Sequence, residues 1–335
     1  MKPALLIAIS FLLPLCLKAQ ITLNSSNAPS QTVCQTNDTG NRVKLSGTLP
    51  DMSVQTNATW DFTTLVDSYG FHTFHDVAST SAFPSATFSH TINYPFAAYQ
   101  YTTTKMFGIA AGGILSYGEH VDRQALPLGT LTGNPNDSLV FAYQDITYAP
   151  TQSEVKFPCT MSTTWTDVTK FTTAFNITVA LYSLSFAPGE RRSTLTVKNT
   201  VKGWGKMRVN DGNGNPTGYM DVLQIEQERT VLDSFFLNGS PAPTALLTAF
   251  GLTQGQISSS AYRNYVRAGE FAPLVEVEYS NNTFATIERC DVHRQRLAPV
   301  SVNDVQLDHI NIYPNPVTNG SFTVKVDGTH KSFSY

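Results

Sequence analysis

The chain has 335 residues, a formal net charge of −3, and only 14% charged residues. Without its first 19 residues it would lose Lys2 and Lys18 and no acid, which brings the net charge from −3 to −5. So mild a charge, with no basic stripe, excludes nucleic acid as an expected partner. The low charged fraction, together with many Thr, Val, Tyr and Phe residues, favours strands over helices.

The first 19 residues have the pattern of a secretory signal peptide. Met1-Lys2 precedes an apolar run from Ala4 to Leu17, and Lys18-Ala19-Gln20 begins the polar part. Because this run is shorter than the roughly 20 apolar residues that span a bilayer, we expect cleavage after Ala19 and not an anchor helix. No later stretch is long and apolar enough to cross a membrane, so we expect no transmembrane segment once the signal is removed.

Residues 20–300 are predicted to form a β-rich body, with a subdivision allowed near residue 150. The glycine-rich run from Gly108 to Gly118 predicts a tight hairpin. Alternation is clearest from Phe171 to Phe186, and Pro188-Gly189 is expected to end that strand in a turn. Further strands are expected at 43–45, 59–62, 138–143, 193–198, 220–231 and 274–279, and 283–290 is expected to pair with the last of these.

Two short helical segments are expected among the strands. Pro243 to Gly251 combines good helix formers with a terminal glycine, and Ser258 to Arg267 could add a second helical turn. Many short strands, frequent turns and the lack of a fixed repeat predict an all-β body of the β-sandwich or jelly-roll kind.

Three cysteines, Cys34, Cys159 and Cys290, remain after Cys16 leaves with the signal. In an oxidising compartment one disulfide can form among them, with one thiol left over. Buried free thiols are the alternative for each, and the sequence does not decide the pairing. Their long separations exclude a CxxC-type zinc site.

One loop has part of a calcium-binding pattern. Asp211, Asn213 and Asn215 have the first three spacings of such a loop, and Asp221 follows nearby. An EF-hand needs glycine at its sixth position and an acid at its twelfth, whereas Pro216 stands at the sixth here. We therefore expect a hairpin turn, with calcium as the alternative and no other cofactor.

The other polar clusters lack a catalytic signature. There is no G-x-S-x-G elbow and no phosphate-binding glycine loop. His72 and His75 would lie on opposite faces of a strand, so they could not share a metal ion. Glu119, His120 and Asp122 follow a glycine-rich turn, and we interpret them as a surface loop.

Three further patterns are considered for function, and the first two also have a simpler structural explanation. Glu276 and Glu278 share a strand face; paired carboxylates can hydrolyse glycosides, but an exposed acidic face is the simpler interpretation. An aromatic cluster could stack on sugars, although core packing explains most of it. Asp137-Ser138-Leu139 resembles a short bacterial O-glycosylation motif. The aromatic cluster comprises Tyr94, Phe96, Tyr99 and Tyr101.

Residues 301–335 differ in character from the body. A strand-like segment ends in Tyr313-Pro314-Asn315-Pro316, Asn319-Gly320 follows as a turn, and Phe322 to Val326 alternates. The two prolines fix an extended exit, and Asn-Gly turns the chain. This resembles the opening of the C-terminal sorting domain of the type IX secretion system, a small Ig-like β domain. Since such tails run several strands further, we expect this sorting domain to be partial.

The tail resemblance implies the type IX secretion machinery as a partner. It also implies a cell-surface or extracellular location if the tail works, and a periplasmic one otherwise. The body resembles uncharacterised exported proteins that carry the same tail, a resemblance that implies architecture and no chemistry. The residues that carry it are Trp60-Asp61-Phe62, Phe157-Pro158 to Trp165, Val201-Lys202-Gly203-Trp204-Gly205 and Tyr219 to Leu223.

These observations favour a non-enzymatic exported protein, either a binding protein or a structural component of the cell surface. Its expected partner is a surface polysaccharide or protein. The alternative is a secreted hydrolase of polysaccharide or peptide, whose site would be assembled from distant residues such as Glu276 or His120. The sequence leaves enzymatic activity open and leans against it.

Overall fold

The structure, a computed structural model, describes residues 20–30, 42–53, 55–71, 75–76, 80–294, 310–313, 321–326 and 329–334. The predicted signal peptide at 1–19, with its cleavage position Ala19, lies outside the described residues. So do Cys34, His72 and the segment 314–320, which holds most of the predicted sorting motif.

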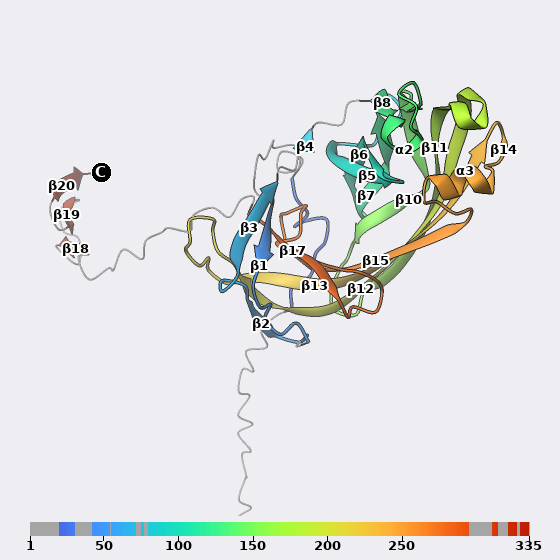
Figure 1. The fold of residues 1–335 in the computed structure, drawn as a ribbon. Helices are drawn as coiled ribbons and strands as arrows, with labels where there is room; N and C mark the ends of the chain where they lie inside the picture. The colour runs from blue at the N-terminus through green and yellow to red at the C-terminus, as the bar shows by residue number, and fades with distance from the viewer. Residues whose placement is uncertain are drawn as a thin grey trace, which may run out of the picture.

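The described body is mostly strand and forms one connected, strongly curved sheet (Figure 1). Strand β2 pairs parallel with β12, and the other described pairings are antiparallel. The strands are β1 (Arg42–Ser46), β2 (Ala58–Asp61), β3 (Val66–Phe71), β4 (His75–Asp76), β5 (Phe88–Phe96), β6 (Tyr99–Ala110), β7 (Gly113–Val121), β8 (Gln124–Pro127), β9 (Ser138–Phe141), β10 (Gln144–Lys156), β11 (Thr164–Val179), β12 (Leu184–Arg208), β13 (Met220–Leu237), β14 (Ser240–Pro241), β15 (Gln256–Val266), β16 (Val275–Tyr279) and β17 (Ile287–His293).

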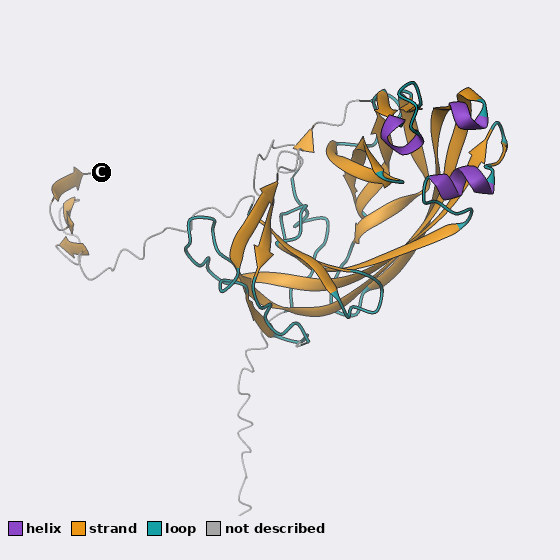
Figure 2. Ribbon diagram, viewed as in Figure 1, coloured by secondary structure: helices purple, strands orange, loops and turns teal. Residues whose placement is uncertain are grey.

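The helical structure within the described residues is short. It comprises α2 (Gly129–Thr132), α3 (Thr244–Ala249) and the 3-10 turn η1 (Ala180–Tyr182), all at one end of the body (Figure 2). The all-β, sandwich-like fold predicted from the sequence is confirmed, and α3 lies within the predicted helical segment. The subdivision considered near residue 150 falls inside β10, which is continuous there.

Strands β11, β12, β13 and β15 form the long central part of the sheet. Side chains alternate between buried and exposed along β11, along β12 and along the last part of β13, so these strands have an inner and an outer face there. Strands β5, β6, β7 and β10 form a second layer across the inner face. The two layers enclose two apolar clusters, in which Tyr101 stacks on Phe141 and Phe88 stacks on Phe107.

A third apolar cluster lies between the other end of the sheet and strands β1, β2 and β3. Trp60 and Phe62, from the strand predicted at 59–62, are both fully buried here and contact Tyr265 edge-on. The predicted hairpin at Gly108–Gly118 is confirmed, since β6 and β7 pair from Ala110 and Gly113 outward.

Two predicted elements are wrong. Ser258 to Val266 lies in strand β15 and not in a helix, because nine register positions on β13 and the pairing with β16 hold it extended. Pro188-Gly189 does not end a strand: β12 runs through it, and the turn occurs earlier, at η1 and the left-handed residue Ser183. Leu181, within the segment predicted as a single alternating strand, is 80% exposed at this turn.

The tail contains three described strands, β18 (Ile310–Tyr313), β19 (Ser321–Val326) and β20 (Thr329–Ser334). They form an antiparallel sheet in which Ile310 is opposite Val326 and Val326 is opposite Thr329. The strands predicted on either side of the Tyr-Pro-Asn-Pro motif are therefore present, and β20 adds a strand that the sequence reasoning did not predict.

Candidate functional site

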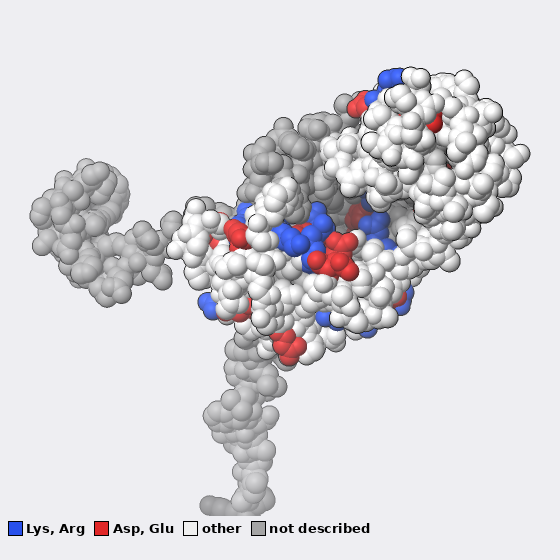
Figure 3. All heavy atoms as spheres, in the orientation of Figure 1, with Lys and Arg blue, Asp and Glu red and all other residues white. Residues whose placement is uncertain are grey.

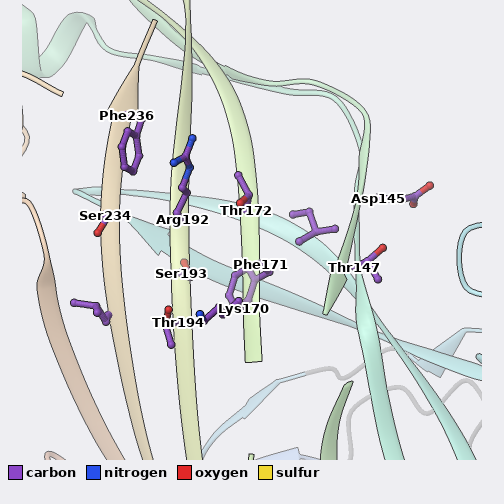
Figure 4. A pocket seen from close by; sticks show the side chains of 12 residues that line it. Asp145, Thr147, Lys170, Phe171, Thr172, Arg192, Ser193, Thr194, Ser234 and Phe236 are labelled. Carbon is purple, nitrogen blue, oxygen red and sulfur yellow. The ribbon is translucent and has the colours of Figure 1, made fainter. Parts of the chain in front are cut away.

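An open groove of about 600 Å³ crosses the outer faces of β11, β12 and β13 beside the start of β10 (Figure 4). The strand register builds its floor in rows. Thr172, Arg192 and Ser234 are directly opposite one another on the three strands. Lys170, Thr194 and Leu232 form the next row. Hydroxyl, cationic and apolar groups therefore alternate along a surface open to solvent.

Arg192 and Phe236 give the groove its most defined feature. The guanidinium carbon of Arg192 lies 3.9 Å from the ring centroid of Phe236, and the two side chains lie side by side in Figure 4. Glu190 accepts a hydrogen bond from Arg192 Nε at 2.9 Å, which fixes the guanidinium plane. A cation held over an aromatic face in this way presents both a stacking surface and further N–H donors.

Strand β10 forms the opposite wall of the groove through Asp145 and Thr147. The Asp145 carboxylate lies 2.8 Å from His120 Nδ1, and Asp122 lies 3.4 Å from Nε2 of the same ring. The exposed Tyr143 ring meets His120 edge-on with centroids 4.6 Å apart. A histidine held between two carboxylates therefore borders the groove.

The prediction of a surface loop at Glu119, His120 and Asp122 is wrong for the first two, which lie in β7. Glu119 is buried between the layers, where its carboxylate accepts hydrogen bonds from Tyr94, at 2.9 Å, and from Tyr148. Burial raises the pKa of both tyrosines well above their usual value, and the nearby Glu119 charge adds to this. The hydroxyls therefore stay protonated as donors to Glu119.

Other polar groups share this inner layer. Arg191 donates to the Tyr101 hydroxyl, Ser193 donates to Asp233 at 2.5 Å, and Lys105 pairs with Glu154 at 2.8 Å. The Arg191–Tyr101 contact joins the two layers, whereas Ser193 and Asp233 are register neighbours on β12 and β13 and Lys105–Glu154 links β6 to β10 within the second layer. Of the predicted aromatic cluster, Phe96 and Tyr101 are buried, and Tyr94 and Tyr99 pack against the same core, so core packing is confirmed.

Glu276 and Glu278 do lie on one strand face, but they are not an exposed acidic surface. Arg42 pairs with Glu276 and with the buried Asp291, in both cases at 2.6 Å, and Arg289 contacts Glu278 at 2.9 Å. Burial raises the pKa of Glu276, and the Arg42 charge opposes this. Charged side chains gather on a hollowed face of this part of the body (Figure 3). Glu276 and His120 have separate sets of partners.

The calcium-loop candidates are engaged in turn and strand contacts. Asp211 Oδ1 accepts the backbone N–H groups of Asn213, at 2.7 Å, and Asn215, at 3.1 Å. The Asn213 bond is the main cause of the lowered pKa of Asp211. Asp221 lies in β13 and pairs with Lys206 at 2.8 Å. The expected hairpin turn is present between β12 and β13.

Cys159 and Cys290 are both free, buried thiols and belong to different apolar clusters. Burial raises the pKa of each to about 12. Asp137, from the glycosylation-like motif, is buried and accepts the backbone N–H of Ala180 at 3.0 Å.

Within the described residues, no group of three or more His, Cys, Asp and Glu side chains is arranged to hold a metal ion. The described helices are also too short and insufficiently apolar to cross a membrane. Comparison with protein-family models, curated proteins and solved structures finds no match to this chain.

Proposed function

We propose that this chain is an exported, non-enzymatic binding protein of the cell surface or extracellular space, and that it binds polysaccharide in the groove over β11, β12 and β13. The observation that carries the proposal is the arrangement of Arg192 on Phe236 beside rows of hydroxyls. Sugar rings offer hydroxyls to polar side chains and C–H faces to aromatic rings, so they require both kinds of group on one open surface.

The open form of the groove supports a polymer over a small molecule. Small ligands are usually enclosed in concave pockets that bury most of their surface. This groove instead runs across neighbouring strands and is open to solvent. A chain of sugar units could lie across the strands and contact Ser234, Arg192 and Thr147 in turn.

The proposed export rests on the two ends of the sequence. The signal-peptide pattern up to Ala19 supports passage through the inner membrane. The Tyr313-Pro314-Asn315-Pro316 motif, flanked by the paired strands β18 and β19, supports the type IX secretion machinery as a partner. Fractionating cells and sequencing the mature N-terminus would test both parts; an uncleaved protein in the cytoplasm would refute export.

A polysaccharide array, followed by titration of each bound polymer, tests the binding function. We expect Arg192→Ala and Phe236→Ala each to weaken binding about tenfold, as hot-spot truncations do. Lys198→Ala is the matched control, because Lys198 is an exposed cation of β12 paired with Glu228 and does not line the groove. Equal binding by all variants would contradict the groove assignment, and release of sugars or peptides by the wild type would favour the hydrolase alternative.

A further inference from the structure

One end of the body is built almost without charge. Four segments, 91–104, 124–144, 171–189 and 234–257, contain no Lys, Arg, Glu or His, and their single acid is Asp137. The chain as a whole is 14% charged, so these segments depart from the rest of the sequence. Asp137 itself is buried, which leaves no ionised Lys, Arg, Asp or Glu side chain of these segments on the surface.

The fold brings these four segments together. All of them contribute to one apolar cluster, through residues such as Phe96, Phe141, Phe175 and Phe235. The loops at this end are tied to each other: Asp137 accepts the N–H of Ala180, and the Tyr182 hydroxyl donates to the carbonyl of Ala245 in α3 at 3.1 Å. The three short helical turns therefore gather at this end (Figure 2), which is largely free of charged atoms in Figure 3.

The β11–β12 turn presents large apolar side chains at this end. Leu181 is 80% exposed and Phe186 is 58% exposed. Phe186 has a φ of +50°, a conformation that bulky residues seldom adopt. The Thr178 hydroxyl accepts its backbone N–H at 3.1 Å and helps to hold this conformation. The turn thus keeps an aromatic ring in solvent at a local energetic cost, which is a signature of functional surfaces.

We propose that this uncharged end docks on a lipid bilayer, with Leu181 and Phe186 inserted below the headgroups and Tyr182 at the interface. A bilayer penalises every ionised side chain brought near its apolar region, which explains a charge-free surface across four separate segments. Tyrosines are favoured at the level of the headgroups. A protein partner would select less strongly against charge, because protein interfaces keep a polar, charged rim.

Flotation of the full chain with neutral phosphatidylcholine vesicles tests the proposal. The protein should float with the vesicles, and the bound fraction should be the same at low and high salt because no charge pairing is involved. The double variant Leu181→Asp with Phe186→Asp should reduce vesicle partitioning at least about tenfold, since it removes apolar area and adds two charges.

Two control variants show whether vesicle binding belongs to this end of the body. Val66→Asp alters an equally exposed apolar residue of β3, at 63% exposure, and should leave flotation unchanged. Arg192→Ala should also leave flotation unchanged. Loss of polysaccharide binding and loss of vesicle binding are therefore distinguishable. Lack of flotation by the wild type would overturn the proposal. The proposal would also be overturned if light scattering showed the wild type to be a dimer and the double variant to be a monomer. A second copy of the chain would then occupy this end.

Discussion

The two ends of the curved sheet differ in the kinds of side chain on their surfaces. Around β1, β16 and β17 the surface is a network of ion pairs, whereas the end around α2, η1 and α3 presents apolar and hydroxyl groups. Strand β12 runs from one end to the other, so a single sheet supports both surfaces. The ion pairs at the charged end include Arg42–Asp291, Arg208–Asp61, Arg263–Glu226 and Arg294–Asp67.

This difference shows that the fold alone does not set the distribution of charge. Alternation along β12 requires only that outer positions tolerate water, and Thr, Ser and Lys all satisfy that requirement. The chain uses ion pairs at one end and avoids ionised groups at the other. We infer that the two ends meet different surroundings, one aqueous and the other apolar.

The largest expected effect comes from breaking the network at the charged end. Asp291→Ala removes a buried carboxylate that Arg42 contacts at 2.6 Å and Arg289 at 2.7 Å. The Arg42 and Arg289 guanidiniums would lose a shared buried partner but keep Glu276 and Glu278, so the loss is that of two charge-assisted contacts and should lower the free energy of unfolding by about 3 kcal/mol. Urea unfolding measures this; a loss below about 1 kcal/mol would show that the network is not a determinant of stability.

A smaller effect is expected from overfilling the core at the uncharged end. A Cβ added at Gly189 would lie 2.2 Å from Cε2 of the buried Phe175 ring. Gly189→Ala should therefore cost about 1–3 kcal/mol of stability in thermal or urea unfolding. Gly112→Ala is the control, because a Cβ at that turn meets nothing within 4 Å. Equal stability of the two variants would mean that the Phe175 ring has room to move.

Acid should weaken the charged end before the uncharged one. Arg208 lowers the pKa of Asp61 from 3.8 to about 2. A carboxyl with a lowered folded-state pKa contributes stability above its unfolded value, and this contribution is lost as pH falls from about 4 to 2. Because the Asp61 side chain is 34% exposed, solvent screening limits the loss to about 1 kcal/mol or less. The free energy of unfolding, measured in urea, should fall between about pH 5 and about pH 2.5 in the wild type. The fall should be smaller in Asp61→Asn.

The smallest effect is expected for an ion pair on the outer face between the two ends. Lys198 and Glu228 are 2.8 Å apart, with side chains 52% and 34% exposed. Lys198→Ala should change the free energy of unfolding by less than about 0.5 kcal/mol in the same assay. A loss of about 2 kcal/mol or more would show that exposed ion pairs also stabilise the central strands.

Local pattern was sufficient to predict the class of fold but not the partners of individual residues. The alternation from Phe171 onward identified β11, and the helix formers after Pro243 identified α3. Ser258 to Val266 has no decisive local preference, so its strand conformation comes from β13 and β16. The burial of Glu119 likewise depends on Tyr94 and Tyr148, which are 25 and 29 residues away.

The groove was missed for the same physical reason. Arg192, Ser234 and Thr172 each occupy an ordinary outward position on a strand, and nothing in their immediate sequence distinguishes them. Only the register of three strands places them in one row. A search for outward polar residues on strands predicted to be neighbours could have found this row, but it would have required the strand order in advance.

The pairing of β1 with β17 has a consequence for how the protein is made. Arg42 and Asp291 are hydrogen-bonded although 249 residues separate them. During synthesis the N-terminal part of the chain is made first, so β1 can pair with β3 early. The other edge of β1 stays unpaired until β17, the last strand of the body, has been made. Joining such distant segments is slow. Completion of the sheet is therefore expected to be a late folding event, which keeps the body incomplete and pliable for most of its synthesis.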